Sequence, residues 1–412
     1  MEKQFCPICG IEVPPNSRYS HYVCQSCATK ACDEDSRPLK FFNTDLSGGF
    51  VAKNAETSET KVVDPHICYI EDVRCWADEA RMGGIVIQPC PDQKERIAGA
   101  LVGLLIGDAL GVPYEFHAAS ELPSFAEIEF EPPAWFRRSH QGVPTGTWSD
   151  DGAQALVLLD SLLTRGKFDA AHFAKGLIAW QDNGFMAVDN YVFDVGIQTS
   201  KAIWHLKQGV SPLEAGGTDE YSNGNGSLMR VLPLALWHQG TNAELVRDAE
   251  LQSRVTHAHP RAQICCALYC LWARRSLQNA DNSWDSDSIW EYAVETLRSI
   301  YLDDSIKTAE LEFQIRPDDL HAPGGSGYVV DSLFSAKWAC GNDNYEKAVK
   351  AAISLGNDTD TTACIAGGVA GLKSGINQIP ERWRAQLRGR EIYEPLLEKL
   401  LKHSAEIQFK QG

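Results

Sequence analysis

The stretch IAGALVGLLIGDALG (97–111) decides how the larger part of this chain folds. Its apolar residues recur at three- and four-residue steps, which is typical of a packed α-helix. Gly99, Gly103, Gly107 and Gly111 are spaced four apart, so they line one face of that helix. Glycine lowers helix propensity, but it lets a second backbone come very close. The sequence therefore predicts a buried helix whose glycine face contacts another element.

Later segments have the same helical period, and period-two alternation is almost absent between residues 95 and 400. These segments are 153–165, 170–181, 261–277, 290–302, 331–339, 345–356 and 393–403. The pattern predicts that the main domain is all-α.

The first 90 residues differ from the rest, because they hold eight of the 13 cysteines and few long apolar periods. QPCPDQKE (88–95), with two prolines and several charges, is typical of a linker. We therefore expect two domains, a small cysteine-rich module and extension over 1–90 and a helical domain over 91–412.

The charge balance limits the function classes. The 412 residues carry 38 Lys and Arg against 55 Asp and Glu, a formal net charge of -17. A protein that binds nucleic acids or anionic membranes needs a basic face, so we expect neither as a partner. The first residues lack a basic region followed by an apolar core, and the longest apolar run, Ile97–Ile106, is shorter than a membrane span. We expect a cytoplasmic protein whose cysteines are reduced.

The cysteine-rich module begins with a metal-binding pattern. Cys6 and Cys9 form one CxxC pair, and Cys24 and Cys27 form another. Two such pairs can complete a tetrahedral thiolate site, which favours one structural Zn²⁺ over a disulfide pair or an iron centre. His21 and Cys32 lie close enough in sequence to replace a ligand. His66, Cys68 and Cys75 could hold a second metal, but their spacing follows no established pattern.

Two acidic motifs lie about two hundred residues apart. Ser149, Asp150 and Asp151 precede an apolar helix, and GNDTDTTACIAGG (356–368) has the same design, with Asp358, Asp360 and Thr361 before small residues. Each motif by itself is typical of a helix cap. Together they supply four carboxylates and several hydroxyls, the oxygen ligands that hard divalent cations prefer. The pair therefore favours a site for two divalent ions.

Six motifs occur in the order found in the ADP-ribosylglycohydrolases, and the chain resembles that family from about residue 94 to about residue 400. The motifs are GLLIGDALGVPYEF (103–116), SDD (149–151), NGSLMRVLPLAL (225–236), VTHAHP (255–260), GSGYVVDSL (325–333) and GNDTDTTACIAGGVAGL (356–372). The resemblance implies an all-α, compact multi-helix domain with two Mg²⁺ or Mn²⁺ ions in a central cleft.

The resemblance also implies roles for individual residues. The metal ligands would be Ser149, Asp150, Asp151, Asp358, Asp360 and Thr361. The catalytic carboxylates would be Asp151, Asp358 and Glu115. The substrate-binding residues would be Asn225, Gly226, Ser227, Met229, Gly325, Ser326, Gly327, Tyr328 and His257. Two positions depart from the family, which usually has Thr in place of Ser149 and often has Thr in place of Gly152.

The implied reaction is hydrolysis of the N-glycosidic bond between ADP-ribose and a protein arginine. Serine-linked ADP-ribose and O-acetyl-ADP-ribose are alternative substrates, because related folds accept those linkages. A different class of function is also open. The protein could act as an immunity protein that blocks a cognate ADP-ribosyltransferase toxin by contact, since the cysteine-rich module and the acidic chain make a protein partner plausible.

Overall fold

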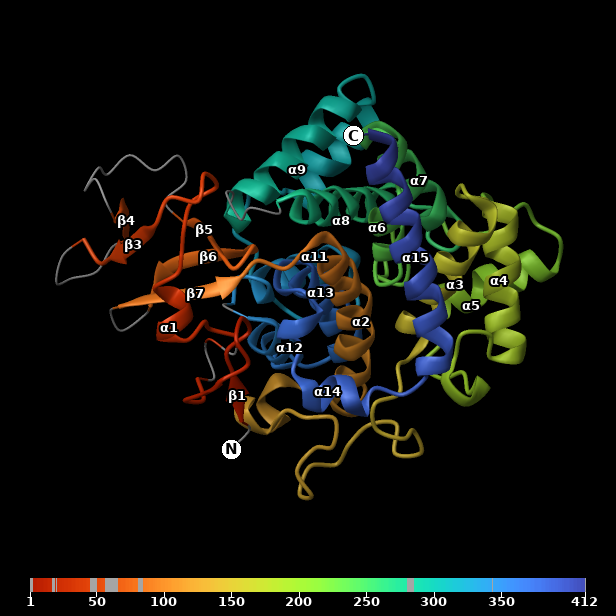
Figure 1. The fold of residues 1–412 in the computed structure, drawn as a ribbon. Helices are drawn as coiled ribbons and strands as arrows, with labels where there is room; N and C mark the ends of the chain where they lie inside the picture. The colour runs from red at the N-terminus through yellow and green to blue at the C-terminus, as the bar shows by residue number, and fades with distance from the viewer. Residues whose placement is uncertain are drawn as a thin grey trace. The chain divides into compact units, whose positions relative to one another are not determined.

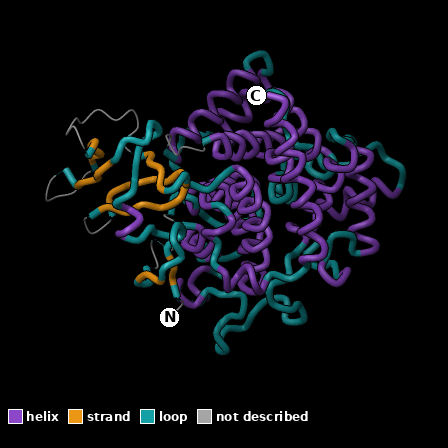
Figure 2. Tube along the Cα trace, in the orientation of Figure 1, coloured by secondary structure: helices purple, strands orange, loops and turns teal. Residues whose placement is uncertain are grey.

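The computed structural model describes residues 3–16, 19, 21–44, 50–55, 66–80, 84–279, 285–342 and 344–411. The chain divides into two compact units, Met1–Asp92 and Gln93–Gly412. Strands are confined to the first unit, and among the described residues the second unit is built from helices and loops (Figure 2). The prediction of an all-α main domain is confirmed.

The first unit consists of short antiparallel strands. Strands β1 (Gln4–Phe5) and β2 (Glu12–Val13) pair, as do β3 (Leu39–Phe42) and β4 (Val51–Asn54). A three-stranded sheet contains β5 (Ile67–Ile70), β6 (Val73–Glu79) and β7 (Ile85–Pro89), with β6 in the middle. The only regular helix among its described residues is α1 (Gln25–Ala28). A small core includes Cys27, Cys68 and Cys75.

The second unit has one large hydrophobic core. Its α-helices are α2 (Gln93–Gly111), α3 (Asp150–Arg165), α4 (Ala170–Asn183), α5 (Ile197–Lys207), α6 (Leu232–Trp237), α7 (Asn242–Arg254), α8 (Pro260–Gln278), α9 (Ser286–Tyr301), α10 (Ser305–Ala309), α11 (Val329–Ala339), α12 (Tyr345–Ile353), α13 (Thr359–Ser374), α14 (Glu381–Gln386) and α15 (Arg390–Gln411). A π-helix, η5 (Glu310–Ile315), follows α10 directly. Among the described residues of the unit there are also five short 3₁₀ turns: η1 (Val112–Tyr114), η2 (Ala119–Glu121), η3 (Phe125–Glu127), η4 (Val188–Asn190) and η6 (Ile376–Gln378).

Helices α2 and α13 lie side by side in the middle of this unit, and their contact explains the glycine row (Figure 1). A Cβ atom added to Gly103 would lie 2.6 Å from the carbonyl oxygen of Gly367, closer than any real Cβ atom sits. Gly99 meets Gly371 in the same way. The prediction that this face contacts another backbone is confirmed, and the partner is the helix of the second acidic motif.

Helix α2 with its following turn, Gln93–Tyr114, has the length and composition of a membrane span. Its whole apolar window is nevertheless buried inside the protein, as expected for the central helix of a packed core. The apolar character of α2 is therefore explained by contacts with the surrounding helices, because α2 touches α3, α6, α8, α13, α14 and α15.

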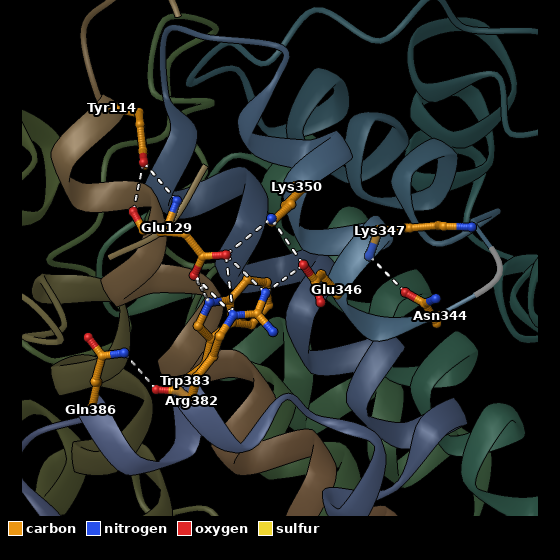
Figure 3. Close-up of polar contacts among 9 residues, drawn as sticks. All are labelled: Tyr114, Glu129, Asn344, Glu346, Lys347, Lys350, Arg382, Trp383 and Gln386. Carbon is orange, nitrogen blue, oxygen red and sulfur yellow. Dashed lines mark hydrogen bonds and ion pairs between the residues drawn. The ribbon is translucent and has the colours of Figure 1, made fainter. Parts of the chain in front are cut away.

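A polar network anchors the long loop that connects α2 to α3 (Figure 3). Glu129, on this loop, accepts hydrogen bonds from Arg382 (2.9 Å) and from the indole N–H of Trp383 (2.6 Å). Its backbone carbonyl accepts from the Tyr114 hydroxyl at 2.7 Å. Burial opposes ionisation of Glu129, but the hydrogen bonds from Arg382 and Trp383 hold its pKa below the ordinary value. The network thus fixes the chain next to Glu115.

Candidate active site

Three helix ends converge on one cleft of about 750 Å³. The start of α3 brings Asp150 and Asp151, the start of α13 brings Asp358 and Thr361, and the end of α2 leads to Glu115. The residues that line the cleft are Glu115, Phe116, Asp150, Asp151, Asp194, Gly196, Ile197, Gln198, Thr199, Tyr221, Gly224, Asn225, Gly226, Met229, His257, Ser326, Gly327, Asn357, Asp358 and Thr361.

Asp108 on α2 fixes the start of α3. Its carboxylate accepts hydrogen bonds from the backbone N–H groups of Ser149 (2.9 Å) and Gly152 (2.7 Å). Burial raises the pKa of Asp108 to about 7 in spite of these bonds. A Cβ atom on Gly152 would lie 2.8 Å from a methyl group of Leu105 and 2.9 Å from Cβ of Trp148, so these side chains would have to shift to admit a threonine. Glycine at this position, one of the two departures from the family pattern, avoids that crowding.

A buried arginine lies behind Asp150. The side-chain amide of Gln154 donates to Asp150 at 2.8 Å, and its oxygen accepts from Arg230 at 2.8 Å. Arg230 also donates to Gln252 and Thr256, and none of its surface is exposed. Burial lowers the pKa of Arg230 to about 10, so it remains a cation at neutral pH. Arg230 thus places a positive charge near the acidic cluster, behind Asp150 at the start of α3.

Asn225 joins the acidic start of α13 to the glycine-rich loops. Its side-chain amide lies 2.8 Å from Asp358 and 2.9 Å from the hydroxyl of Ser332, and its backbone N–H donates to Gly327 at 3.1 Å. Across the cleft, Thr361 donates weakly to Asp151 at 3.4 Å. The two acidic motifs that lie far apart in sequence are therefore in direct contact.

Glu115 has two partners that sequence reasoning missed. Nε2 of His140 lies 2.7 Å from its carboxyl group, and Asp194 forms a side-chain hydrogen bond with it. Burial, followed by the charges of Asp194 and Asp358, raises the pKa of Glu115 to about 11. Burial and the charge of Asp358 raise the pKa of Asp194 to about 6. Asp194 comes from a loop with no recognisable motif, so only the fold places it here.

The cleft has a high density of carboxyl groups, which favours the binding of cations. Seven carboxyl groups gather in or beneath it, namely Asp108, Glu115, Asp150, Asp151, Asp194, Asp358 and Asp360. Burial, and then mutual repulsion, raises the pKa values of Asp150, Asp151 and Asp360 well above their ordinary range. Among the described residues, one buried oxygen of Asp151 and one of Asp360 have no hydrogen-bond partner. Glu115, Asp358 and Asp360 offer ligand oxygens within 4.8 Å of one another. This donor set fits hard divalent cations.

Comparisons with known proteins agree with this geometry. The family model described as ADP-ribosylglycohydrolase matches residues 89–408. The chain belongs to the ADP-ribosylglycohydrolase family. It is therefore a glycohydrolase by family, as the six motifs predict.

Individual relatives of this ADP-ribosylglycohydrolase are similar over most of their length. The ADP-ribosylarginine hydrolase Tri1 of Pseudomonas putida is 31% identical over 321 residues, which cover 77% of this chain and 81% of that protein. Tri1 of Serratia proteamaculans is 29% identical over a match that covers 78% of this chain and 83% of that protein. A solved structure titled ADP-ribosylglycohydrolase-related protein complex matches with a TM-score of 0.60 at 29% identity, over 76% of this chain and 99% of that chain.

The structure brings most of the predicted site residues of this glycohydrolase to the cleft. Its wall includes Asn225, Gly226, Met229, His257, Ser326 and Gly327. Ser149 and Asp360 are buried and lie outside the lining. Three predicted substrate-binding residues also lie outside it. Ser227 is fully buried and its hydroxyl accepts from Ser253, Gly325 is buried, and the Tyr328 hydroxyl accepts from Arg261 at 3.1 Å.

The four cysteines of the first unit form one cluster. The Sγ atoms of Cys6, Cys9, Cys24 and Cys27 lie within 4.8 Å of one another, and those of Cys9 and Cys24 are 3.6 Å apart. Burial opposes thiolate formation at Cys6, but hydrogen bonds from backbone N–H groups, that of Cys24 first, lower its pKa to about 6. This arrangement can hold a tetrahedral metal ion.

The other candidate ligands of the first unit have different surroundings. The His66 ring stacks between Phe50 and Trp76, with centroid distances of 4.4 Å and 4.5 Å. Cys68 and Cys75 face each other across β5 and β6 and are completely buried. In the part of the chain that the structure describes, no group of potential metal ligands includes these residues, His21 or Cys32.

Proposed function

We propose that the protein hydrolyses the N-glycosidic bond between ADP-ribose and arginine side chains of proteins. The observation that carries this proposal is the meeting of two acidic helix starts with Glu115 in one cleft. The names of the Tri1 relatives, ADP-ribosylarginine hydrolases at 31% and 29% identity, support arginine as the linkage.

We further propose that the cleft holds two Mg²⁺ or Mn²⁺ ions. The ligands would be Ser149, Asp150, Asp151, Asp358, Asp360 and Thr361. The buried oxygens of Asp151 and Asp360 that lack hydrogen-bond partners support this proposal, because an uncompensated buried carboxylate is costly. When bound, such ions orient sugar hydroxyl groups and stabilise negative charge on oxygen.

The reaction needs two proton transfers that involve the chain's own residues, one to a residue and one from a residue. One carboxylate takes a proton from the attacking water, and a second group donates a proton to the departing guanidine. Asp151 and Asp358 are our candidates for these transfers, followed by Glu115. The raised pKa of Glu115 and its contact with His140 suit a group that keeps its proton at neutral pH. Glu115 therefore joins Asp151 and Asp358 as a candidate for the acid.

The glycine-rich loops would hold the nucleotide. Gly226 and Gly327 line the cleft, and backbone N–H groups in such loops bind phosphate oxygens. His257 lies beside Gly226, and burial with the nearby charge of Arg230 lowers its pKa to about 3. A neutral imidazole at this place can form hydrogen bonds with the nucleotide without adding charge.

A substrate panel tests the proposal. The protein is incubated with ADP-ribose linked to arginine, with ADP-ribose linked to serine and with O-acetyl-ADP-ribose, each with Mg²⁺, Mn²⁺ or a chelator. We expect release of ADP-ribose from arginine that needs the metal and is lost in Asp360→Ala. Cleavage of only the serine or O-acetyl conjugate would overturn the arginine assignment. Full activity of Asp360→Ala under chelation would overturn the two-metal proposal.

The alternative function, contact block of a cognate ADP-ribosyltransferase toxin, stays a prediction. A catalytically inactive Asp358→Asn variant separates the two roles. If hydrolysis is the whole function, this variant will fail to protect cells that express the toxin. Protection by the inactive variant would favour the contact mechanism.

For the first unit we propose one structural Zn²⁺ bound by Cys6, Cys9, Cys24 and Cys27. The mutual proximity of their sulfur atoms supports it. A site with four thiolates leaves no position for substrate, so the ion would stabilise the fold without taking part in hydrolysis.

A further inference from the structure

A second cavity, of about 370 Å³, lies beside Glu115 and has a different chemical character from the cleft. Its lining residues are His117, Arg137, Arg138, Ser139, His140 and Gln141. None of them is acidic, although the chain as a whole has a formal net charge of -17. Two arginines therefore line a space with no carboxylate in its wall.

The two arginines differ in how many hydrogen-bond and ion-pair partners their guanidinium groups have. Arg138 donates to the carbonyl of Val143 at 2.9 Å and lies 3.4 Å from Glu131, and 18% of its side chain is exposed. Its Nε atom is buried and has no hydrogen-bond partner among the described residues. Arg137 is exposed, and none of the residues that the structure describes forms a hydrogen bond or ion pair with it. Arg137 thus offers its whole guanidinium group to a ligand.

The cavity shares a wall with the cleft. His140 lines the cavity and contacts Glu115, which lines the cleft. Phe116 also lines the cleft, is 69% exposed, and its ring centre lies 5.6 Å from that of His140. A group held in the cavity would therefore lie beside the cleft.

We propose that this cavity binds an aspartate or glutamate side chain of the ADP-ribosylated protein, close to the modified arginine. The inference rests on the proposed function and specifies its substrate class. The planar guanidinium group matches a carboxylate in shape and charge. An acidic protein with an acidic cleft repels acidic surfaces, so the unpaired charge of Arg137 in this cavity would reverse that preference locally.

The test uses a series of peptides, each with one ADP-ribosylated arginine and one Asp. The position of the Asp varies through the series, from four residues before the arginine to four residues after it. Peptides with Asn at the same positions are the reference. We expect Asp at one or two positions to raise kcat/KM about two- to five-fold through KM, which is the range of exposed ion pairs. Arg137→Ala should remove this preference and Arg137→Glu should reverse it.

Two controls isolate the cavity. Lys167→Glu makes the same change of charge on an exposed residue just beyond the far end of α3, and it should keep the preference for Asp. ADP-ribosylated agmatine carries the diphosphate but no carboxylate, and its hydrolysis should be unchanged in Arg137→Glu.

Three results would overturn the inference. One is equal rates for the Asp and Asn peptides at every position. The second is a preference for Asp that survives Arg137→Glu. The third is slower hydrolysis of ADP-ribosylated agmatine by that variant, to the same degree as the Asp peptides, which would assign the cavity to the diphosphate. If the wild-type protein cleaved none of these arginine conjugates, the proposed function would fail as well.

Discussion

Replacing Asp360 with Asn should raise stability in the absence of metal and reduce the further stabilisation that metal gives. Asp360 is completely buried at the start of α13. One carboxyl oxygen accepts from the backbone N–H of Thr361 at 2.7 Å, and the other has no partner among the described residues. Burial, followed by the charges of Glu115 and Asp151, raises its pKa well above the ordinary value. Without cations, the native fold must therefore either bury the charged carboxylate of Asp360 or keep this carboxyl group protonated at a pH where it would normally be ionised.

The size of the effect follows from that proton. Keeping a carboxyl group protonated at pH 8, about four units above its ordinary pKa, costs up to about 5 kcal/mol. The Asn side chain avoids this cost, so in chelator the variant should unfold at a temperature up to about 10 °C higher than the wild type, at roughly 2 °C per kcal/mol. Metal at one hundred times its Kd stabilises the wild type by about 2.7 kcal/mol. The variant, which lacks a ligand, should gain much less.

Thermal unfolding of both proteins at pH 8, with chelator and then with Mn²⁺, measures both changes. Asp303→Asn is a matched control, because Asp303 is exposed and the variant should behave like the wild type in both conditions. An Asp360→Asn protein that is less stable than the wild type in chelator, or equally stabilised by Mn²⁺, would refute the reasoning.

Three further predictions concern the rest of the molecule. In chelator the wild-type protein should unfold at lower temperature as pH rises from 4 through 7. The pKa values in the folded protein are raised to about 6 for Asp194 and about 7 for Asp108, so these groups favour the folded state only while they are protonated. Calorimetry in a pH series checks this sign, and an unfolding temperature that does not change with pH would contradict it. Gly103→Ala should lower the free energy of unfolding by about 1–3 kcal/mol or more in denaturant melts, because its Cβ would clash with the backbone of α13. Cys9→Ser should lower the zinc content of the purified protein while hydrolysis by the second unit is kept, and loss of hydrolysis would show that the two units depend on each other.

The sequence predicted those helices whose apolar faces are broad. Helices α2, α3, α8 and α13 are nearly all buried, so their patterns are strong. Helix α7 was missed because its residues are mostly polar, although Thr241 and Glu244 at its start form a capping box that could have revealed it. Helix α5 was missed because its apolar residues do not share one face: Ile197 and Trp204 are exposed, whereas the polar Thr199 is buried.

The candidate site was predictable where ligands occur in pairs along the chain. Asp150 and Asp358 belong to motifs whose carboxylates are adjacent or two residues apart. Asp194 and His140 occur singly in loops, and only the tertiary fold brings them to Glu115. Asp108 belongs to a recognised motif, but its role in fixing α3 depends on backbone N–H groups, which no residue pattern specifies.

The glycine row and the acidic cluster are two parts of one arrangement. The last glycine of the row, Gly111, packs against the backbone of Asp360, so that an added Cβ would lie 2.6 Å from the Asp360 nitrogen. Three residues earlier on the same helix, Asp108 holds the start of α3. The close contact between α2 and α13 therefore sets the distance between the two acidic helix starts. Because backbone atoms pack with little freedom, the carboxylates stay near one another despite their repulsion, and this forced proximity would favour the binding of cations that we propose for the cleft.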